Sequence, residues 1–211
     1  MTFFDRLEAT RERCNVLEHP FYQRWSAGEL TRDELAVYAG QYRHAVSALA
    51  EAAANAARAA EPELRAQLEL HAGEEASHVA LWDDFAHAMG GAADAPAAPE
   101  TAACAQAWAG DGERPLLASL VALYAIESGQ PAIATTKNQG LTAFYDIQDG
   151  PGTAYFALHA ELDHEHAAAG RALIEARLEG ADEEALLATA ESVLRANWEL
   201  LDGVERLNGR A

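Results

Sequence analysis

Residues 159–166 of this chain read HAELDHEH. At about 100° per residue of an α-helix, His159, Asp163 and His166 fall within roughly 60° of one another. His164 points about 140° away from His159. Two imidazoles and a carboxylate on one helical stripe suit a divalent metal that prefers oxygen and nitrogen ligands, such as iron or manganese. The alternative is a solvated face of His and Glu on an alanine-rich helix.

A second segment, residues 71–78, reads HAGEEASH. His71, Glu75 and His78 occupy positions i, i+4 and i+7, so they form a single stripe of the predicted helix, and Glu74 lies at its edge. This stripe pairs imidazoles with carboxylates, as residues 159–166 do. The two segments are therefore expected to face each other across a helical core.

Glu127 supplies the third group, directly after the apolar run of residues 116–126. A carboxylate that ends such a run is costly to bury unless it is paired or bound to a metal. Helical bundles build dinuclear carboxylate sites from Glu and His that project inward from several helices. The three segments together predict a metal site; the alternative is that Glu127 pairs with an arginine while Glu74 and Glu75 face water.

Composition predicts an all-α protein with one domain over residues 1–211. Half of the residues are apolar, and the 15 glycines and 7 prolines lie mostly between periodic runs. The net charge of −19 argues against nucleic acid and anionic membrane surfaces, since both require a basic face. No signal peptide or run of 18 uninterrupted apolar residues is visible, so a cytoplasmic location is expected. Cys14 and Cys104 form no CxxC pair or secretory framework and are expected to be small buried residues.

Capping and breaking residues predict seven or eight helices in one layered bundle. Thr31 and Glu34 form a capping box at the start of a helix that ends near residue 60. Gly129-Gln130-Pro131 is expected to kink or break a helix that begins near Pro115, and Gly150-Pro151-Gly152 is predicted as a turn. The other helices are expected over about 3–15, 20–27, 62–89 and 183–207, with helical sequence resuming at 101 and continuing through 159–166.

Several short motifs resemble those of the haem-oxygenase-like superfamily, whose members include TenA-type thiaminases, PqqC-type oxidases and diiron oxidases. They are HPFYQRW at 19–25, GELT at 28–31, YAGQY at 38–42, HVALW at 78–82, YAIESGQP at 124–131 and YF at 155–156. The resemblance covers nearly the whole chain. The N-terminal motifs mark only the superfamily, whereas the Glu–His, Glu and His-x₃-Asp-x₂-His set marks the diiron branch. The resemblance implies a haem-oxygenase-like helical domain and a homodimer.

The resemblance also implies a ligand set. The residues that match it are Glu75, His78, Glu127, His159, Asp163 and His166, with Glu127 as the bridging carboxylate. In the para-aminobenzoate-forming branch the first glutamate lies seven residues before the histidine, a place that His71 holds here. The first carboxylate is therefore Glu75 or Glu74, or else His71 serves as a fourth imidazole.

Lys137, the only lysine in the chain, follows Glu127 by ten residues. The same offset holds in the para-aminobenzoate-forming branch, where a lysine near the metals is linked to amine supply. Lys137 and Tyr155 are the candidate catalytic residues. Aromatic side chains that either line the pocket or fill the core are Tyr22, Tyr42, Tyr124, Tyr155 and Trp82.

The resemblance implies a non-haem diiron oxidase or oxygenase. It would activate O₂ to oxidise a small organic substrate by hydroxylation, oxidative C–C or C–N cleavage, or amine oxidation. Two irons are expected, with manganese or a mixed iron–manganese pair as variants, and a reductant as a further partner. One alternative is a metal-free TenA- or PqqC-like enzyme, although neither Cys14 nor Cys104 lies where the TenA nucleophile is expected. The other is a non-catalytic helical interaction module.

Overall fold

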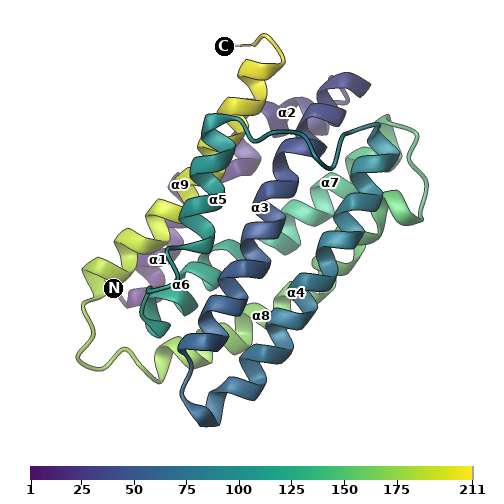
Figure 1. Ribbon diagram of the computed structural model, residues 1–211. Coiled ribbons are helices and arrows are strands. Elements are labelled where there is room, and N and C mark those ends of the chain that lie inside the picture. Colours follow the sequence, from purple (N-terminus) through teal and green to yellow (C-terminus); the bar gives the residue numbers. More distant parts are fainter. Residues whose placement is uncertain (211) are drawn as a thin grey trace.

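The computed structural model describes residues 1–210, which fold into α-helices and one short 3₁₀ helix, with no strand among them (Figure 1). The predicted all-α class is confirmed. The helices are α1 Phe3–Arg13, η1 Val16–Glu18, α2 Pro20–Ala27, α3 Arg32–Ala59, α4 Pro62–Met89, α5 Pro99–Ala109, α6 Leu116–Glu127, α7 Gln130–Phe144, α8 Pro151–Glu175 and α9 Glu183–Leu207.

Local sequence signals set the ends of several helices. The side chain of Thr31 accepts a hydrogen bond from the backbone N–H of Glu34, and Glu34 accepts one in return from the N–H of Thr31, which completes the predicted capping box of α3. Gly28 ends α2 and Gly90 ends α4, both with a positive φ near 70–78° that favours glycine. α3 and α4 are equally long and pack against each other as an antiparallel pair.

The predicted break before Pro131 separates α6 from α7. Ser128 and Gly129 keep right-handed helical dihedrals, so the two helices form one continuous run. If α6 and α7 are counted as one helix, the described residues form eight α-helices, the upper of the two predicted numbers. This run, Leu116–Phe144, is long and apolar enough to cross a membrane by composition. Because 67% of its most apolar window is buried inside the protein, the core accounts for that apolarity.

The turn predicted at Gly150-Pro151-Gly152 is partly wrong, because α8 already begins at Pro151. Proline is favoured in the first turn of a helix, where its fixed φ fits and its missing N–H has no partner to lose. The hydroxyl of Thr153 also accepts a hydrogen bond from the N–H of Gly150. The helix that carries His159 therefore begins two residues earlier than the predicted turn allows.

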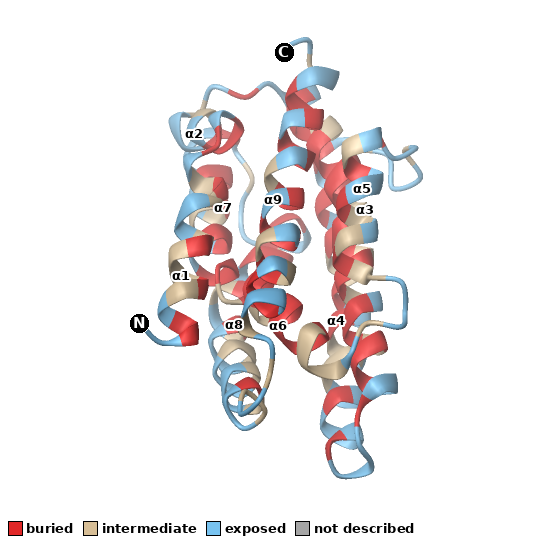
Figure 2. Cartoon of the chain, turned by 90° about the vertical axis from the view of Figure 1, so that its left-hand side faces the viewer, coloured by how far each residue is buried: buried red, intermediate tan, exposed pale blue. Residues whose placement is uncertain are grey.

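The bundle buries the faces that carry the three ligand segments. α4 packs against α3 on one side and α8 on the other, while α6 lies against α3, α8 and α9 (Figures 1 and 2). α7 packs against α2 and α8, and a close approach fixes its position. A Cβ at Gly140 would lie 2.5 Å from the indole nitrogen of Trp25, which donates to the backbone oxygen of Lys137.

Candidate metal centre and buried lysine

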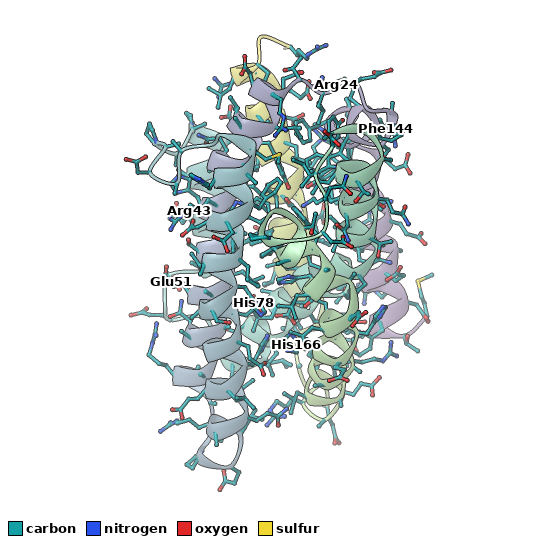
Figure 3. All side chains as sticks on the ribbon, turned by 90° about the vertical axis from the view of Figure 1, so that its right-hand side faces the viewer. Arg24, Arg43, Glu51, His78, Phe144 and His166 are labelled. Carbon is teal, nitrogen blue, oxygen red and sulfur yellow. The ribbon has the colours of Figure 1, made fainter. Side chains whose placement is uncertain are left out.

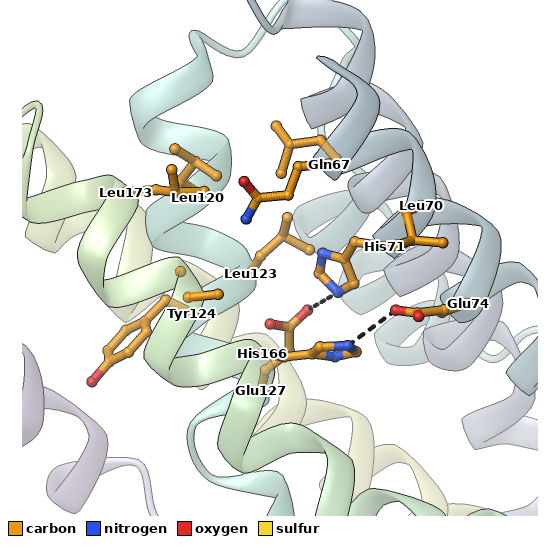
Figure 4. Close-up of a pocket in the computed structure, with 13 residues that line it drawn as sticks. Gln67, Leu70, His71, Glu74, Leu120, Leu123, Tyr124, Glu127, His166 and Leu173 are labelled. Carbon is orange, nitrogen blue, oxygen red and sulfur yellow. Dashed lines mark hydrogen bonds and ion pairs between the residues drawn. The ribbon is translucent and has the colours of Figure 1, made fainter. Parts of the chain in front are cut away.

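Three helices bring the ligand-type side chains of the sequence together inside the bundle. α4 contributes the 71–78 segment, α6 ends in Glu127, and α8 contributes the 159–166 segment (Figures 3 and 4). Their most buried carboxylates and imidazoles are only 1–3% exposed: Glu75, His78, Glu127, His159 and Asp163. His164 is exposed on the far side of α8.

The side chains form two groups that share one carboxylate. The first group is His71, Glu75, Glu127 and His166, and the second is Glu75, His78 and His159; within each, the potential ligand atoms lie within 4.8 Å of one another. Glu75 Oε1 lies 3.3 Å from His78 Nδ1 and 3.9 Å from both His71 Nε2 and His166 Nδ1. Glu75 thus belongs to both groups, whereas Glu127, the bridging carboxylate implied by the resemblance, belongs to one.

Many polar atoms of these groups are buried without a well-aligned hydrogen-bond partner among the described residues. Both oxygens of Asp163 are in this state, and so is one ligand-type atom in each of Glu75, Glu127, His71, His78, His159 and His166. A buried polar atom without a partner costs about 1–3 kcal/mol, and more when it is charged. So many in one place fit a bound cation, and three carboxylates with four imidazoles match the donors that iron accepts.

Two histidines are oriented by hydrogen bonds on the ring nitrogen that faces away from the centre. His159 Nδ1 donates to the backbone oxygen of Tyr155 at 2.7 Å, which leaves Nε2 free of partners. His166 Nε2 lies 3.2 Å from a carboxylate oxygen of Glu74, which leaves Nδ1 facing Asp163 at 3.6 Å (Figure 4). Metal-binding histidines are commonly held in this way by a carboxylate or a backbone carbonyl.

These contacts distinguish His71 from Glu74, the two alternative ligands predicted from the sequence. His71 Nε2 points at Glu127 Oε1 across 3.0 Å and belongs to the first group. Glu74 is the most exposed of the acidic residues here, with 40% of its side chain accessible, and it lies outside both groups. Its contact is with the outer nitrogen of His166. The arrangement therefore places His71 among the potential ligands and Glu74 behind one of them.

The charges of the centre depend on one another. Burial raises the pKa of Glu127. Burial also opposes ionisation of Glu75, but the adjacent imidazole of His78 lowers its pKa overall. The carboxylate of Asp163 raises the pKa of His166 to about 9. Without a metal, a proton on His166 therefore offsets part of the carboxylate charge, and a metal would replace that proton.

Lys137 lies in a different environment, although it is also buried, with 1% exposure. Its Nζ is 4.6 Å from the centroid of the Tyr42 ring and 5.1–5.7 Å from the ring centroids of Tyr22, Tyr38, Trp82 and Phe156. Burial alone lowers the pKa of Lys137 well below its ordinary value of 10.5. We call these five rings and the amine the lysine cage.

Aromatic rings in contact connect the lysine cage to the metal centre. Tyr155 stacks on His159 with ring centroids 4.0 Å apart, and Trp82 contacts Tyr155 at 4.8 Å. Trp82 and Tyr155 were among the aromatic residues predicted to line the pocket or fill the core, but two rings of the cage, Tyr38 and Phe156, were not. Tyr38 lies one helical turn before Tyr42, so its spacing contains a usable signal; Phe156 offers none. Tyr124 lies apart from the cage, against Phe4, and lines the cavity that reaches the metal centre.

A cavity reaches the metal centre between α4, α6 and α8 (Figure 4). Its volume is about 140 Å³, which is enough for a small molecule. His71, Glu127 and His166 line its inner end, and the walls are mainly leucines. A small apolar molecule such as O₂ therefore has a route to the centre.

Comparison with known proteins places this geometry in a family. The chain is 33% identical to the 4-aminobenzoate synthases of Chlamydia muridarum and Chlamydia trachomatis, over 96% of this chain and 89% and 91% of theirs. It is 32% identical to the 4-aminobenzoate synthase of Nitrosomonas europaea, over 96% of this chain and 91% of that protein.

Solved structures share the fold at low sequence identity. A Shewanella denitrificans domain of unknown function with a haem oxygenase-like fold superposes with a TM-score of 0.82 at 15% identity, over 99% of this chain and 94% of that one. A TenA homologue from P. horikoshii superposes with a TM-score of 0.77 at 16% identity, over 99% and 100%. The profile of the family described as iron-containing redox enzyme matches residues 37–198. The chain is therefore an oxidoreductase with a haem-oxygenase-like fold, and it belongs to the iron-containing redox enzyme family.

Proposed function

We propose that the chain is a non-haem diiron oxygenase that uses O₂ to form 4-aminobenzoate. Iron binding and oxidoreductase activity follow from the family. The reaction product is proposed from the relatives, which are named for 4-aminobenzoate synthesis. The number of metal ions and the use of O₂ are proposed from the geometry of the centre.

One observation carries the diiron proposal: two groups of ligand atoms meet at Glu75. A shared carboxylate between two imidazole-containing groups is how helical bundles hold two metal ions close together. Asp163 adds a third buried carboxylate beside His166, 3.6 Å from its Nδ1. Three carboxylates offset most of the charge of two divalent ions. We assign His71, Glu75, Glu127 and His166 to one ion and Glu75, His78 and His159 to the other. Asp163 projects from α8 beside His166, where its charge would help to hold the ions.

The protein contributes orientation and shielding. Two ferrous ions at this centre would supply electrons to O₂, which makes it the oxidant of the reaction. The Tyr155 carbonyl holds His159 with its inner nitrogen free, and Glu74 does the same for His166. The leucine-lined cavity admits O₂, while the buried faces of α4, α6 and α8 keep water away from the reacting groups.

Lys137 is proposed as the source of the amino group. Its Nζ would bond to the ring of an aromatic acid as a ring hydroxyl leaves as water. O₂, reduced to hydrogen peroxide, would then oxidise the Nζ–Cε bond to an imine, and hydrolysis would release 4-aminobenzoate and leave an aldehyde at Cε. Burial among aromatic rings lowers the pKa of the amine, which favours its neutral, nucleophilic form. Trp82 of the lysine cage meets Tyr155 edge-on, and Tyr155 stacks on His159, so these two rings link the cage to that histidine. Tyr155 is proposed as a positioning residue, because its ring stacks on His159 and its carbonyl fixes the same imidazole.

Anaerobic loading with Fe(II), followed by O₂, tests the proposal. The expected result is about two irons per chain, O₂ consumption and 4-aminobenzoate detected by mass spectrometry. Parallel loading with manganese, and with both metals, identifies the preferred pair. Less than about half an iron per chain would favour the metal-free TenA- or PqqC-like alternative. Bound iron with no O₂ uptake would refute the oxygenase. A reductant and a homodimer stay predictions.

A further inference from the structure

A second cavity lies on the opposite face of α6 from the metal centre. It has a volume of about 140 Å³ and is formed by α1, η1, α5, α6, α7 and α9. On α6 the first cavity is lined by Leu120, Leu123 and Glu127, whereas the second is lined by Ala125 and Ile126. At about 100° per residue these sets face opposite directions. The second cavity is therefore separate from the metal centre.

The inner end of this cavity holds an unused hydrogen-bond acceptor. Asn197 on α9 lines the cavity, is 7% exposed, and its Oδ1 has no partner among the described residues. A buried acceptor without a donor is destabilising, so a ligand N–H at this point would gain a partner that the protein lacks. The same amide borders the hydroxyl of Tyr42, a member of the lysine cage.

The mouth of the cavity holds a cation. Arg11 lines it, and the guanidinium uses Nε and Nη2 to pair with Glu8. Nη1 is directed to the junction of α6 and α7, where a Cβ built on Gly129 would lie 3.7 Å away. In a chain of net charge −19, an arginine with a donor turned into a cavity favours an anionic group there.

Apolar side chains complete the lining. Trp108, Ile126 and Ile133 line the same cavity as Arg11 and Asn197. The cavity thus offers a cation, apolar walls and a hydrogen-bond acceptor. A molecule that uses all three has a carboxylate, a planar ring and an N–H donor at the far end of the ring.

We infer that the second cavity binds a small aromatic carboxylic acid that carries an amino group opposite the carboxylate. Its carboxylate would contact Arg11, its ring would lie between Trp108 and the isoleucines, and its amine would donate to Asn197. Taking 4-aminobenzoate as the ligand rests on the proposed function. Trp108 lies 6.3 Å from Tyr42, whose ring covers the amine of Lys137, so the cavity adjoins the place where the amino group is proposed to originate. It would hold the product beside that place.

Cys14 gives a direct readout, since it lines this cavity and is only half-buried. Cys104, the other cysteine, is 0% exposed, so alkylation of the folded protein reports Cys14. We would measure the rate of Cys14 alkylation by iodoacetamide in the purified full-length protein, by mass spectrometry, at increasing 4-aminobenzoate. The expected result is saturable protection, weaker protection by benzoate, and none by aniline.

Matched variants locate the site. Arg11→Met should weaken protection by about tenfold or more, the effect of losing a charged hydrogen bond, while Arg13→Met removes the same charge from the exposed face of α1 and should leave protection unchanged. Asn197→Leu keeps the side-chain volume and should remove the preference for 4-aminobenzoate over benzoate. Gln67→Leu, in the first cavity, should have no effect. Circular dichroism checks that each variant is folded.

Absence of protection in the unmodified protein would overturn the inference, as would equal effects of Arg11→Met and Arg13→Met. Loss of protection in Gln67→Leu would move the ligand to the first cavity and also overturn it. The test does not depend on turnover. Protection without 4-aminobenzoate synthesis would contradict the proposed function alone, and synthesis without protection would contradict only this cavity.

Discussion

The metal centre and the lysine cage are both buried and both contain ionisable groups, but they treat charge in opposite ways. The centre gathers three carboxylates and four imidazoles whose inner atoms lack well-aligned partners. The cage surrounds one amine with five aromatic rings, and burial is the only cause that shifts its pKa. Between the two regions, Trp82 meets Tyr155 edge-on and Tyr155 stacks on His159.

The difference indicates what each region requires. Buried carboxylates in excess are stabilised by a cation, and so the centre is suited to metal ions. A buried amine without a counter-charge is stabilised by losing its proton, and so the cage favours the neutral, nucleophilic form of Lys137. Among the described residues, the bundle thus holds a metal-binding region and a buried amine near each other with no salt bridge between them. The variants below test that separation.

The largest effect is expected from Glu75→Gln. Because Glu75 belongs to both ligand groups, its loss should reduce iron from about two per chain to near zero and abolish O₂ uptake. Glu74→Gln is the matched control, one residue away on α4. It removes only the outer partner of His166, so iron affinity should fall by about 10–100-fold while saturating iron still fills the site. Similar iron loss at saturation in both variants would contradict the assignment of Glu75 as the shared ligand.

Asp163→Asn should have a smaller effect on iron. It keeps the shape of the side chain but removes one buried charge, so iron should fall from about two towards about one per chain, with O₂ reactivity lost and helicity kept. His164→Ala, on the exposed face of the same helix, should leave iron content unchanged. Metal analysis and circular dichroism measure both outcomes. Equal loss in the two variants, or none in Asp163→Asn, would rule out a dinuclear centre that uses this stripe.

Lys137→Met should separate the cage from the centre. The methionine fills a similar volume among the aromatic rings, so iron content and O₂ consumption should remain near those of the unmodified protein. Formation of 4-aminobenzoate should fall below detection by mass spectrometry, since the proposed amine is gone. Undiminished product would show that the amino group comes from elsewhere. Lost iron would show that the two regions are not independent.

The same variant tests whether the amine is neutral in the folded protein. The pKa of Lys137 is lowered on folding, so below pH 10.5 the unfolded chain binds a proton that the folded chain does not, and stability falls as the pH falls. The stability gained by Lys137→Met should therefore increase by up to about 1.4 kcal/mol for each pH unit below 10.5, until the folded amine also protonates. Urea unfolding of both proteins in the same metal state measures this, and a gain that is flat with pH would contradict the neutral amine.

The smallest effect is expected from a change at Glu34, a buried carboxylate that forms ion pairs with arginines of the protein. Burial opposes its ionisation, but hydrogen bonds from Thr31 and Arg24 hold the pKa of Glu34 at about 2. Its contribution is complete above pH 4.5 and is lost as the pH falls towards 2. Glu34→Gln should therefore reduce stability by about 2 kcal/mol at pH 7 and by much less near pH 2, whereas Glu29→Gln, which is exposed, should change little.

Local sequence determined the helices and the faces that they bury. The Thr31–Glu34 capping box, the glycines at 28 and 90 and the break before Pro131 set helix ends through hydrogen bonds and dihedral preferences within a few residues, so they were readable. Helical periodicity likewise placed Asp163 on the buried stripe of α8 and His164 on its exposed side. These features depend only on neighbours along the chain.

Only the tertiary structure decided how separate helices meet. It made Glu75 common to both ligand groups, placed His71 inside the centre and set Glu74 behind His166, because these relations depend on the packing of α4 and α6 against α8. It also surrounded Lys137 with rings from α2, α3, α4 and α8, and left Asn197 without a donor in a cavity bounded by six elements. Spacing along one helix fixes a direction around its axis, but distances between helices come from the packing of the whole core.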